Sequence, residues 1–309
     1  MPRHPIRFSV ALSNQNIAWN DYLAAVKAAD ELAFETFWTF DHLMPIGGDM
    51  DGPCHECYTT MAAFAAATRR IRIGALVSGA AYRNPAMTLK LATQVDVISN
   101  GRFDFGIGAG WAEREFKAFN LPFRSPKERV GTLRELVQLA NQLWTGDPTR
   151  KVTFEGKYVQ AHDLFLNPRP VQKPRPPILI GGGGEQLTLR VVARYADIWH
   201  GFGDPQTLQR KIGLIRDYAK GYGRDPDEIQ FSTNVPIWVG ELPAGFQPAP
   251  TRGGGPGRMP AYGSPEQIEA RIREYVDLGI TYIIVGSPGR YDLDNWRRVS
   301  EQVIPRFSR

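Results

Sequence analysis

The sequence has few cysteines, no long hydrophobic run and no block of like charge. Two cysteines, Cys54 and Cys57, cannot support a disulfide scaffold in a chain of 309 residues. A membrane-spanning helix needs roughly 20 consecutive apolar residues, and the sequence contains no such run. The initial segment MPRHPIRFSV lacks the apolar region of a signal peptide. We therefore expect a cytoplasmic globular protein with no membrane partner.

The charge of the chain is only mildly positive. Lys and Arg number 37 and Asp and Glu number 32, which gives a formal net charge of +5. Aromatic residues do not interleave with basic patches, so the sequence argues against nucleic-acid binding. A composition that is 42% hydrophobic and 11% aromatic supplies a large core and excludes disorder as the dominant state.

Short apolar runs alternate with amphipathic stretches along the whole chain. The runs predict buried strands at 6–12, 36–40, 71–77, 102–107, 178–180, 196–200, 229–239 and 282–285. Helical spacing predicts helices at 19–32, 59–67, 84–99, 126–144, 185–195, 207–222, 265–278 and 292–303. About eight βα units predict a (β/α)8 TIM barrel, an α/β fold, as a single domain over residues 1–309. A doubly wound sheet is the alternative, but it would not usually need this many units.

Two segments interrupt this rhythm, and we interpret both as insertions in the barrel. Residues 151–177 contain the hairpin-like VTFEGKYVQ and a proline-rich run. Residues 240–263 contain QPAPTRGGGPGR, which is too rich in glycine and proline to pack a core and is expected to be mobile. The second segment follows the predicted strand 229–239 on the active-site side of a barrel, so it is either a lid or an insertion without a role.

Candidate chemistry lies where predicted strands end, because barrel active sites form at the carboxyl-terminal ends of the strands. Asp41 and His42 follow the second strand, and histidine titrates near neutral pH and can serve as a general acid or base. Adjacent residues on an extended strand point to opposite faces, so Asp41 need not be the partner of His42. A structural role for His42 is the alternative. His200 is a weaker candidate that could simply cap its strand.

Glycine marks the other strand ends. The run Gly181 to Gly184 directly precedes a predicted helix, where free backbone amides favour a phosphate, although a tight turn explains it as well. The segment 106–110 fails the dinucleotide-binding pattern because Trp111 stands at its third glycine. Cys54 and Cys57 resemble half a zinc site without a second half, so we expect no metal. This face suits a flat aromatic ligand that bears a phosphate.

Several motifs together resemble one known family. They are WTFDHLMP at 38–45, LVSGAAYRNPA at 76–86, DVISNGRFDFGIGAGWAEREF at 96–116, PILIGGGGEQLTLRVVARYADIWH at 177–200, and the closing QVIPRF. In this order they resemble the luciferase-like monooxygenase superfamily, and within it the branch of oxidoreductases that depend on the deazaflavin coenzyme F420. The resemblance covers nearly the whole chain.

The resemblance implies a TIM barrel, usually a homodimer, with Asp41 and His42 at the cofactor and substrate mouth. It also implies a bulged third strand with a non-prolyl cis peptide at Leu76–Val77 beneath the cofactor ring, and glycines of the fifth strand near the cofactor phosphate. The cofactor-binding residues that follow from it are Leu76, Val77, Ser78, Gly79, Ala109, Gly110, Trp111, Gly181, Gly182 and Gly183.

The activity implied is transfer of a hydride between coenzyme F420 and a small organic substrate. An FMN-dependent monooxygenase of the same superfamily and a non-catalytic barrel that binds small molecules are the alternatives. Trp38, Trp199 and Arg290 are candidate substrate contacts, and Arg252 and Arg258 could meet the anionic tail of F420. Sugar-phosphate dehydrogenases of this family carry a glutamate after the fourth strand where this chain has Trp111, and their substrate-phosphate lysines are not evident. The sequence therefore argues against that activity.

Overall fold

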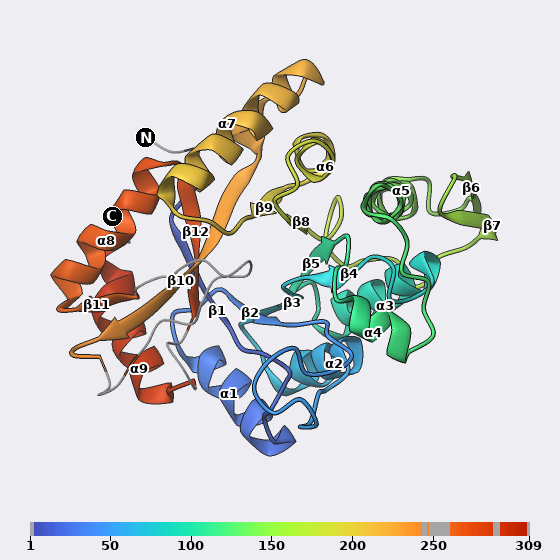
Figure 1. Cartoon of the computed structure of the whole chain (residues 1–309). Helices are drawn as coiled ribbons and strands as arrows, with labels where there is room; N and C mark the ends of the chain where they lie inside the picture. The colour runs from blue at the N-terminus through green and yellow to red at the C-terminus, as the bar shows by residue number, and fades with distance from the viewer. Residues whose placement is uncertain (1–2, 243–245, 247–259, 287–290, 308–309) are drawn as a thin grey trace.

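The computed structural model describes residues 3–242, 246, 260–286 and 291–307. Eight parallel strands form a closed barrel, and helices lie around its outside (Figure 1). The barrel is closed because the sixth strand, Ile198–His200, pairs with the seventh, Gln230–Val239. In order around the barrel the strands are β1 (Arg7–Ala11), β2 (Thr36–Thr39), β3 (Arg72–Ala75), β5 (Phe103–Gly108), β8 (Ile178–Gly181), β9 (Ile198–His200), β10 (Gln230–Val239) and β12 (Ile280–Gly286). The predicted (β/α)8 barrel is confirmed.

Helices follow most of the strands, and two of the longer ones begin with a complete capping box. Ser125 with Glu128 and Ser264 with Gln267 satisfy the first backbone amides of their helices, and proline occupies the first turn of both. The helices are α1 (Trp19–Glu31), α2 (Cys57–Ala67), α3 (Pro85–Ile98), α4 (Glu113–Ala118), α5 (Pro126–Thr145), α6 (Thr188–Tyr195), α7 (Pro205–Gly221), α8 (Pro265–Asp277) and α9 (Leu293–Arg298).

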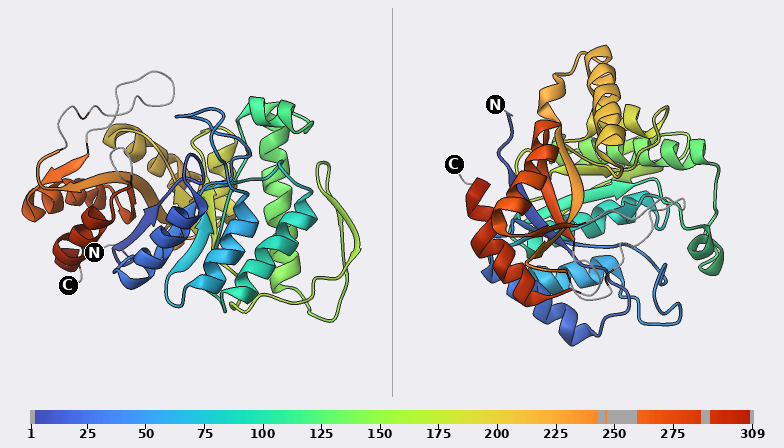
Figure 2. Two further views of the ribbon diagram at one scale, coloured as in Figure 1. Left: turned by 90° about the horizontal axis from the view of Figure 1, so that it is seen from below. Right: turned by 60° about the vertical axis from the view of Figure 1, so that its left-hand side comes forward.

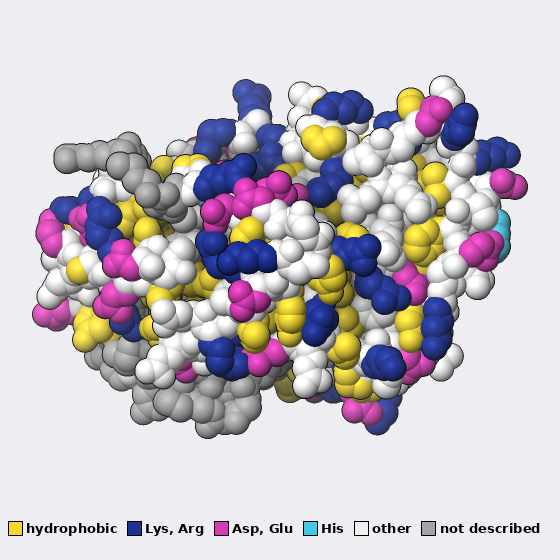
Figure 3. Space-filling view, turned by 90° about the horizontal axis from the view of Figure 1, so that it is seen from above, with side chains coloured by type: hydrophobic (Ala, Val, Ile, Leu, Met, Phe, Trp, Pro, Cys, Tyr) yellow, Lys and Arg dark blue, Asp and Glu magenta, His cyan; other side chains and the backbone are white. Residues whose placement is uncertain are grey.

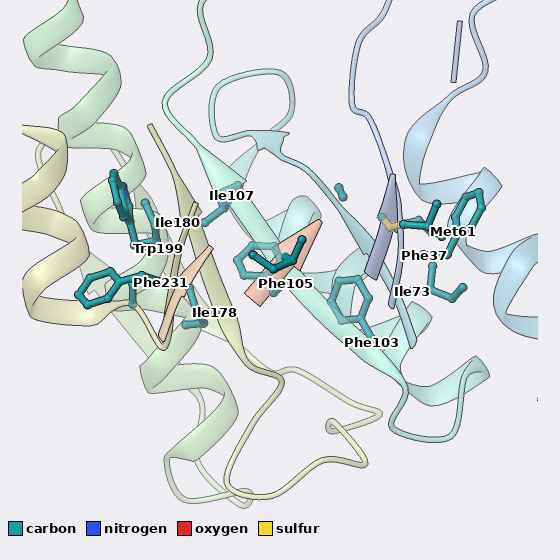
Figure 4. Packing of buried hydrophobic residues seen from close by; sticks show 14 of the residues in the cluster. Phe37, Met61, Ile73, Phe103, Phe105, Ile107, Ile178, Ile180, Trp199 and Phe231 are labelled. Carbon is teal, nitrogen blue, oxygen red and sulfur yellow. The ribbon is translucent and has the colours of Figure 1, made fainter. Parts of the chain in front are cut away.

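Alternation along the strands separates two apolar layers. Ile178 and Ile180 of β8 pack outward against the helices, whereas Leu179 between them faces the barrel interior. Figure 4 shows the outward layer, in which Phe103, Phe105 and Ile107 of β5 project toward the surrounding helices. The interior cluster consists of Trp38, Leu76, Leu179, Ile198, Tyr282 and Ile284. Both faces of the sheet are therefore buried, as parallel sheets require.

The indole of Trp38 fits inside the barrel because two neighbouring strands carry glycine beside it. A Cβ added at Gly74 would lie 2.4 Å from the Trp38 ring. A Cβ added at Gly106 would lie 1.8 Å from the backbone oxygen of Ala75 and 3.3 Å from the same ring. A larger residue at either position would have to displace the ring or the backbone of a close-packed interior.

Charged and polar side chains close the barrel at the amino-terminal ends of the strands. Arg72 donates to Oδ1 of Asp104 at 2.6 Å, and the same buried carboxylate accepts from Thr36 at 2.9 Å. The Tyr282 hydroxyl donates to Thr36, and the guanidinium of Arg7 lies 4.4 Å from the centre of the Tyr282 ring. This cluster of polar side chains stabilises the barrel, because the active sites of such barrels lie at the opposite end.

The structure describes most of the first predicted insertion, 151–177, but little of the second, 240–263. β6 (Val152–Glu155) and β7 (Gln160–Leu164) form the antiparallel hairpin predicted within 151–177. The hairpin lies beyond α5 at one edge of the molecule (Figures 1 and 2). Most of the segment 240–263, including Arg252 and Arg258, lies outside the described residues, but its end forms β11 (Ala261–Gly263) beside β10. No helix among the described residues is long and apolar enough to cross a membrane.

Two local features depart from the sequence prediction. The strand predicted at 71–77 ends at Ala75, and a two-residue strand β4 (Ser78–Gly79) follows the irregular Leu76–Val77 peptide. The short helix α4 was not predicted at all. It follows the glycine-containing end of β5 and places Glu115 over the end of the barrel.

Candidate active site

The loops after β2 and β5 bring His42 and Glu115 together at the carboxyl-terminal end of the barrel. Nδ1 of His42 lies 3.1 Å from Oε1 and 3.0 Å from Oε2 of Glu115. The His42 side chain is 13% exposed and that of Glu115 is 1% exposed. The interaction is therefore largely shielded from bulk water. The histidine singled out from the sequence has a carboxylate partner, but that partner is not Asp41.

Three further groups donate hydrogen bonds to the Glu115 carboxylate. Oε1 accepts from the backbone amides of Leu43 and Met44 at 2.7 and 3.1 Å, and Oε2 accepts from the Tyr82 hydroxyl at 2.5 Å. Burial by itself would raise the pKa of Glu115, but the hydrogen bonds from His42 and Tyr82 hold that pKa below its ordinary value. Glu115 is therefore an anion at neutral pH.

Asp41 is occupied by protein groups on both oxygens. Arg83 donates to Oδ2 at 2.8 Å and to Oδ1 at 2.9 Å, and the Ser78 hydroxyl and the Gly79 amide donate to Oδ2 at 2.6 and 3.2 Å. The carboxylate is buried, and Arg83 also reaches Glu56 at 2.6 Å. The geometry thus ties Asp41, Ser78 and Gly79 to each other, and it leaves none of the three open to a ligand.

The peptide bond between Leu76 and Val77 is cis. The Val77 side chain lies between the ends of two strands, because a Cβ added at Gly108 or at Gly181 would come within 2.7 or 2.8 Å of its methyl groups. Ala109 and Gly110 directly follow the end of β5 and are partly exposed. The ends of β3, β5 and β8 therefore meet around Val77, which brings together residues that the sequence placed in one cofactor site.

The loop between β8 and α6 presents open backbone amides. Gly182 has a φ of +135°, which a residue with a side chain rarely adopts, and its amide donates to the His200 carbonyl at 3.2 Å. Among the residues that the structure describes, none accepts a hydrogen bond from the amides of Gly183 and Gly184. These two amides are available to an anion.

A lysine stands beside this loop. A Cβ added at Gly183 would lie 2.5 Å from Nζ of Lys211 on α7, so glycine leaves room for the amine. Burial lowers the pKa of Lys211. Within the described part of the chain, no carboxylate lies within ion-pair distance of this amine, whereas its neighbour Arg210 pairs with Glu185. The amides and the amine are donor groups of the kind that hold a phosphate.

The aromatic candidates divide into one exposed and two buried residues. Trp111 is 44% exposed, and its ring lies edge-on to that of His42 at a centroid distance of 5.7 Å. Trp38 and Trp199 are fully buried, and Trp199 donates to the Gly182 carbonyl at 2.9 Å. The structure does not bring these two to the mouth of the site. Arg290 lies outside the described residues.

The remaining candidates have structural partners. Nδ1 of the buried His200 lies 3.0 Å from the Ser232 hydroxyl. Cys54 and Cys57 are free thiols, and the Cys54 thiol donates to the His42 carbonyl at 3.1 Å. Burial raises the pKa of Cys54 to about 11, so it remains protonated at neutral pH. In the described ranges, no three His, Cys, Asp or Glu side chains are grouped to hold a metal ion.

Sequence reasoning missed Glu115, Tyr82 and Lys211. Glu115 is one of two glutamates in the AEREF segment, and nothing local distinguishes it from the exposed Glu113. Lys211 gave a detectable signal, because it lies three residues after Leu208 and directly before Ile212 on the apolar side of its helix. A lysine at such a position is expected to meet a specific partner or ligand.

Comparisons with known proteins identify the family of the chain. The sequence model of the luciferase-like monooxygenase family matches residues 4–246. An F420-dependent glucose-6-phosphate dehydrogenase of Amycolatopsis mediterranei is 33% identical over 324 residues, which cover 90% of this chain and 92% of that protein. An F420-dependent glucose-6-phosphate dehydrogenase of Microbacterium testaceum is 26% identical, with 98% of each chain covered.

Solved structures share the fold. The coenzyme F420-dependent tetrahydromethanopterin reductase of Methanopyrus kandleri superposes with a TM-score of 0.82 at 20% identity, over 98% of this chain and 100% of that chain. A monooxygenase of Streptomyces bottropensis superposes with a TM-score of 0.78 at 21% identity, over 98% and 100%. With the family model covering most of the sequence, the chain belongs to the luciferase-like monooxygenase family.

Proposed function

We propose that the protein is an oxidoreductase that transfers a hydride between coenzyme F420 and a small, neutral organic substrate. The proposal is supported by three features that lie at one end of the barrel. They are the open amides of Gly183 and Gly184 with Lys211 beside them, the Val77 peptide, and the His42–Glu115 pair. Relatives that cover 90% or more of the chain are named as F420-dependent dehydrogenases. This name is what favours the deazaflavin among flavin-like cofactors.

The residues present fit such a cofactor. Its phosphate would be held by the amides of Gly183 and Gly184 and by the Lys211 amine, where the absence of a Cβ leaves a cradle. Leu76, Val77 and the Ala109–Gly110 turn would support the ring. When bound, the deazaflavin supplies the site that accepts or gives the hydride, and the protein supplies position and electrostatics.

His42 would hold the proton that accompanies the hydride. Its Nδ1 is taken up by Glu115, and its ring is partly exposed beside Trp111. Histidine is the side chain best suited to accept or release a proton near neutral pH. Asp41 would act only indirectly, by fixing β4 through the hydrogen bonds from Ser78 and Gly79.

The substrate we propose is neutral and largely apolar. Beside His42 stands the exposed indole of Trp111, in the place where the resemblance puts a glutamate in sugar-phosphate dehydrogenases. An indole face buries apolar area and offers no charge. A sugar phosphate would need cations for its phosphate. Of the described cations near this end, Lys211 is assigned to the cofactor, Arg83 pairs with Asp41 and Glu56, and Arg129 donates to the Gly110 and Arg124 carbonyls.

An FMN-dependent monooxygenase is the second candidate function. It is favoured by the family name and by the similarity to the Streptomyces bottropensis monooxygenase. FMN and F420 share a flat tricyclic ring and a ribityl phosphate, so the glycine loop and Lys211 suit both. F420 adds an anionic tail, which the net charge of +5 favours weakly because salt screens exposed charges beyond about 8 Å.

Titration of the purified protein with F420 and with FMN, side by side, tests the cofactor. We expect saturable quenching of tryptophan fluorescence by F420 and weaker or no response to FMN. Tight binding of FMN with no response to F420 would favour the monooxygenase. No response to either cofactor would favour a barrel that binds other small molecules without turnover.

We further propose that residues 1–309 act as one cytoplasmic domain that forms a homodimer. The free state of both cysteines suits a reducing compartment, and the dimer follows from the family resemblance. On the face drawn in Figure 3, lysine and arginine side chains are interspersed with acidic ones, which does not suit a nucleic-acid partner. Light scattering on the eluting protein measures the mass against the monomer mass of 34.6 kDa.

A further inference from the structure

We propose that Glu115 is a positioning residue that fixes neutral His42 in the tautomer protonated on Nδ1, which reserves Nε2 for the travelling proton. The proposal rests on the proposed function for the use of that proton. The tautomer itself is a property of the protein without any cofactor, so it can be tested separately.

The tautomer follows from what each group can donate. A neutral imidazole has one N–H donor and one acceptor nitrogen, and an ionised carboxylate only accepts. Nδ1 of His42 lies 3.0 to 3.1 Å from both oxygens of Glu115. Because two acceptors cannot share a hydrogen bond without a proton, the neutral ring must carry its proton on Nδ1. Nε2 is then left as an acceptor.

The carboxylate is itself held in one orientation. Oε1 accepts from the amides of Leu43 and Met44, which belong to the same turn as His42, and Oε2 accepts from Tyr82. Burial at 1% exposure removes competing water. The donors therefore come from the β2 turn and from the turn after β4, and they hold Glu115 ionised and immobile against the imidazole.

This arrangement gives a sharp consequence for Glu115→Gln. The amide oxygen of the new side chain must face the Leu43 and Met44 amides, because both are donors. Its NH2 group then occupies the place of Oε2, where it donates to Nδ1 of His42. The amide oxygen, 3.1 Å from Nδ1, already accepts two backbone amides, so the Nδ1–H tautomer loses its better acceptor and gains a donor facing it. The neutral ring should therefore populate the Nε2–H tautomer more, and that tautomer cannot accept a proton on Nε2. An equivalent amide substitution in the Ser-His-Asp triad of a serine protease leaves the geometry intact and lowers kcat about 10⁴-fold.

The experiment is two-bond ¹⁵N–¹H correlation NMR of histidine-labelled protein without cofactor, recorded from pH 6 to 9 so that the neutral ring is reached. Substitution His42→Gln assigns the His42 signals among the five histidines. We expect Nδ1–H in the wild type and a clearly larger share of Nε2–H in Glu115→Gln. Glu113→Gln is the matched control, because Glu113 is on the same helix but exposed and paired with Lys117; it should resemble the wild type.

Each outcome supports or overturns the proposal. A wild-type ring protonated on Nε2, or an unchanged tautomer in a folded Glu115→Gln, would overturn it. If Glu115→Gln does not fold, the wild-type spectrum alone decides, and Tyr82→Phe, which keeps the carboxylate, should retain Nδ1–H. Failure of the protein to bind F420 would leave the tautomer result standing, so the two proposals fail separately.

Discussion

Replacement of Lys211 by glutamine is expected to weaken cofactor binding without unfolding the protein. The amine lies beside Gly183, whose missing Cβ leaves it room, and it lacks an ion-pair partner among the described side chains. A hydrogen bond to a charged group contributes about 1.5–3 kcal/mol, and each 1.4 kcal/mol is tenfold in Kd. The loss is therefore about 10- to 150-fold. Because Lys211 is only half-buried, we expect the lower end, about tenfold.

Arg210→Gln is the matched control. Arg210 precedes Lys211 on the same helix, but its side chain is 56% exposed and it pairs with Glu185. Exposed pairs contribute little, so this variant removes one positive charge whose partner, Glu185, follows the glycine loop, and it leaves Lys211 and the Gly183 and Gly184 amides in place. We expect its Kd for F420 to stay near that of the wild type.

The assay is fluorescence titration with F420 at two salt concentrations. Wild-type affinity should fall more steeply with salt than that of Lys211→Gln, because the variant has lost the charge that salt screens. Thermal unfolding should be similar in all three proteins. Equal losses of affinity in both variants, or none in Lys211→Gln, would refute the assignment of Lys211 to the cofactor phosphate.

Four further predictions concern the barrel and the site. His42→Ala should keep F420 affinity and lower turnover about 10²–10⁴-fold; full activity would make this histidine structural. Gly106→Ala should destabilise the barrel, because its Cβ would lie 1.8 Å from a backbone oxygen, and urea unfolding should show a lower midpoint. Asp104→Ala removes the carboxylate partner of Arg72, which is partly exposed and keeps its hydrogen bonds to Gly101, Phe103 and Gln172, and should cost about 1–3 kcal/mol of unfolding free energy, with Asp294→Ala on the surface as a control. Glu115→Gln should be destabilised by about 1–3 kcal/mol at pH 7; since the folded pKa of Glu115 is depressed, the wild-type advantage should shrink as pH falls below about 4.3.

The barrel was predictable because its strands are local patterns. Residues 178–180 and 282–285 are apolar on both faces, and such runs separated by amphipathic helices specify a parallel sheet with two buried faces. The end of the strand at Ala75 was harder to predict. The resemblance placed a cis peptide at Leu76–Val77, which the structure contains, but apolar periodicity alone continued the strand through it.

The sequence did not reveal which way some side chains point or which residues pair across the fold. Trp38 was a candidate substrate contact because it ends a strand, yet Gly74 and Gly106 on neighbouring strands leave room for its ring inside the barrel. The pairing of His42 with Glu115 joins the loop after β2 to the short helix α4, which lies far from it in sequence. A single sequence does not show which carboxylate the fold brings next to a histidine.

Anaerobic turnover tests the central claim most directly. Purified protein is mixed with reduced F420 and a panel of neutral aldehydes and ketones, and the return of oxidised deazaflavin absorbance is followed beside a sample that contains reduced FMN and oxygen. We expect cofactor oxidation that needs the carbonyl compound, needs no oxygen, and is lost in His42→Ala. Oxygen consumption with FMN beyond that of the same mixture without protein, and no reaction of F420 with any carbonyl compound, would contradict it.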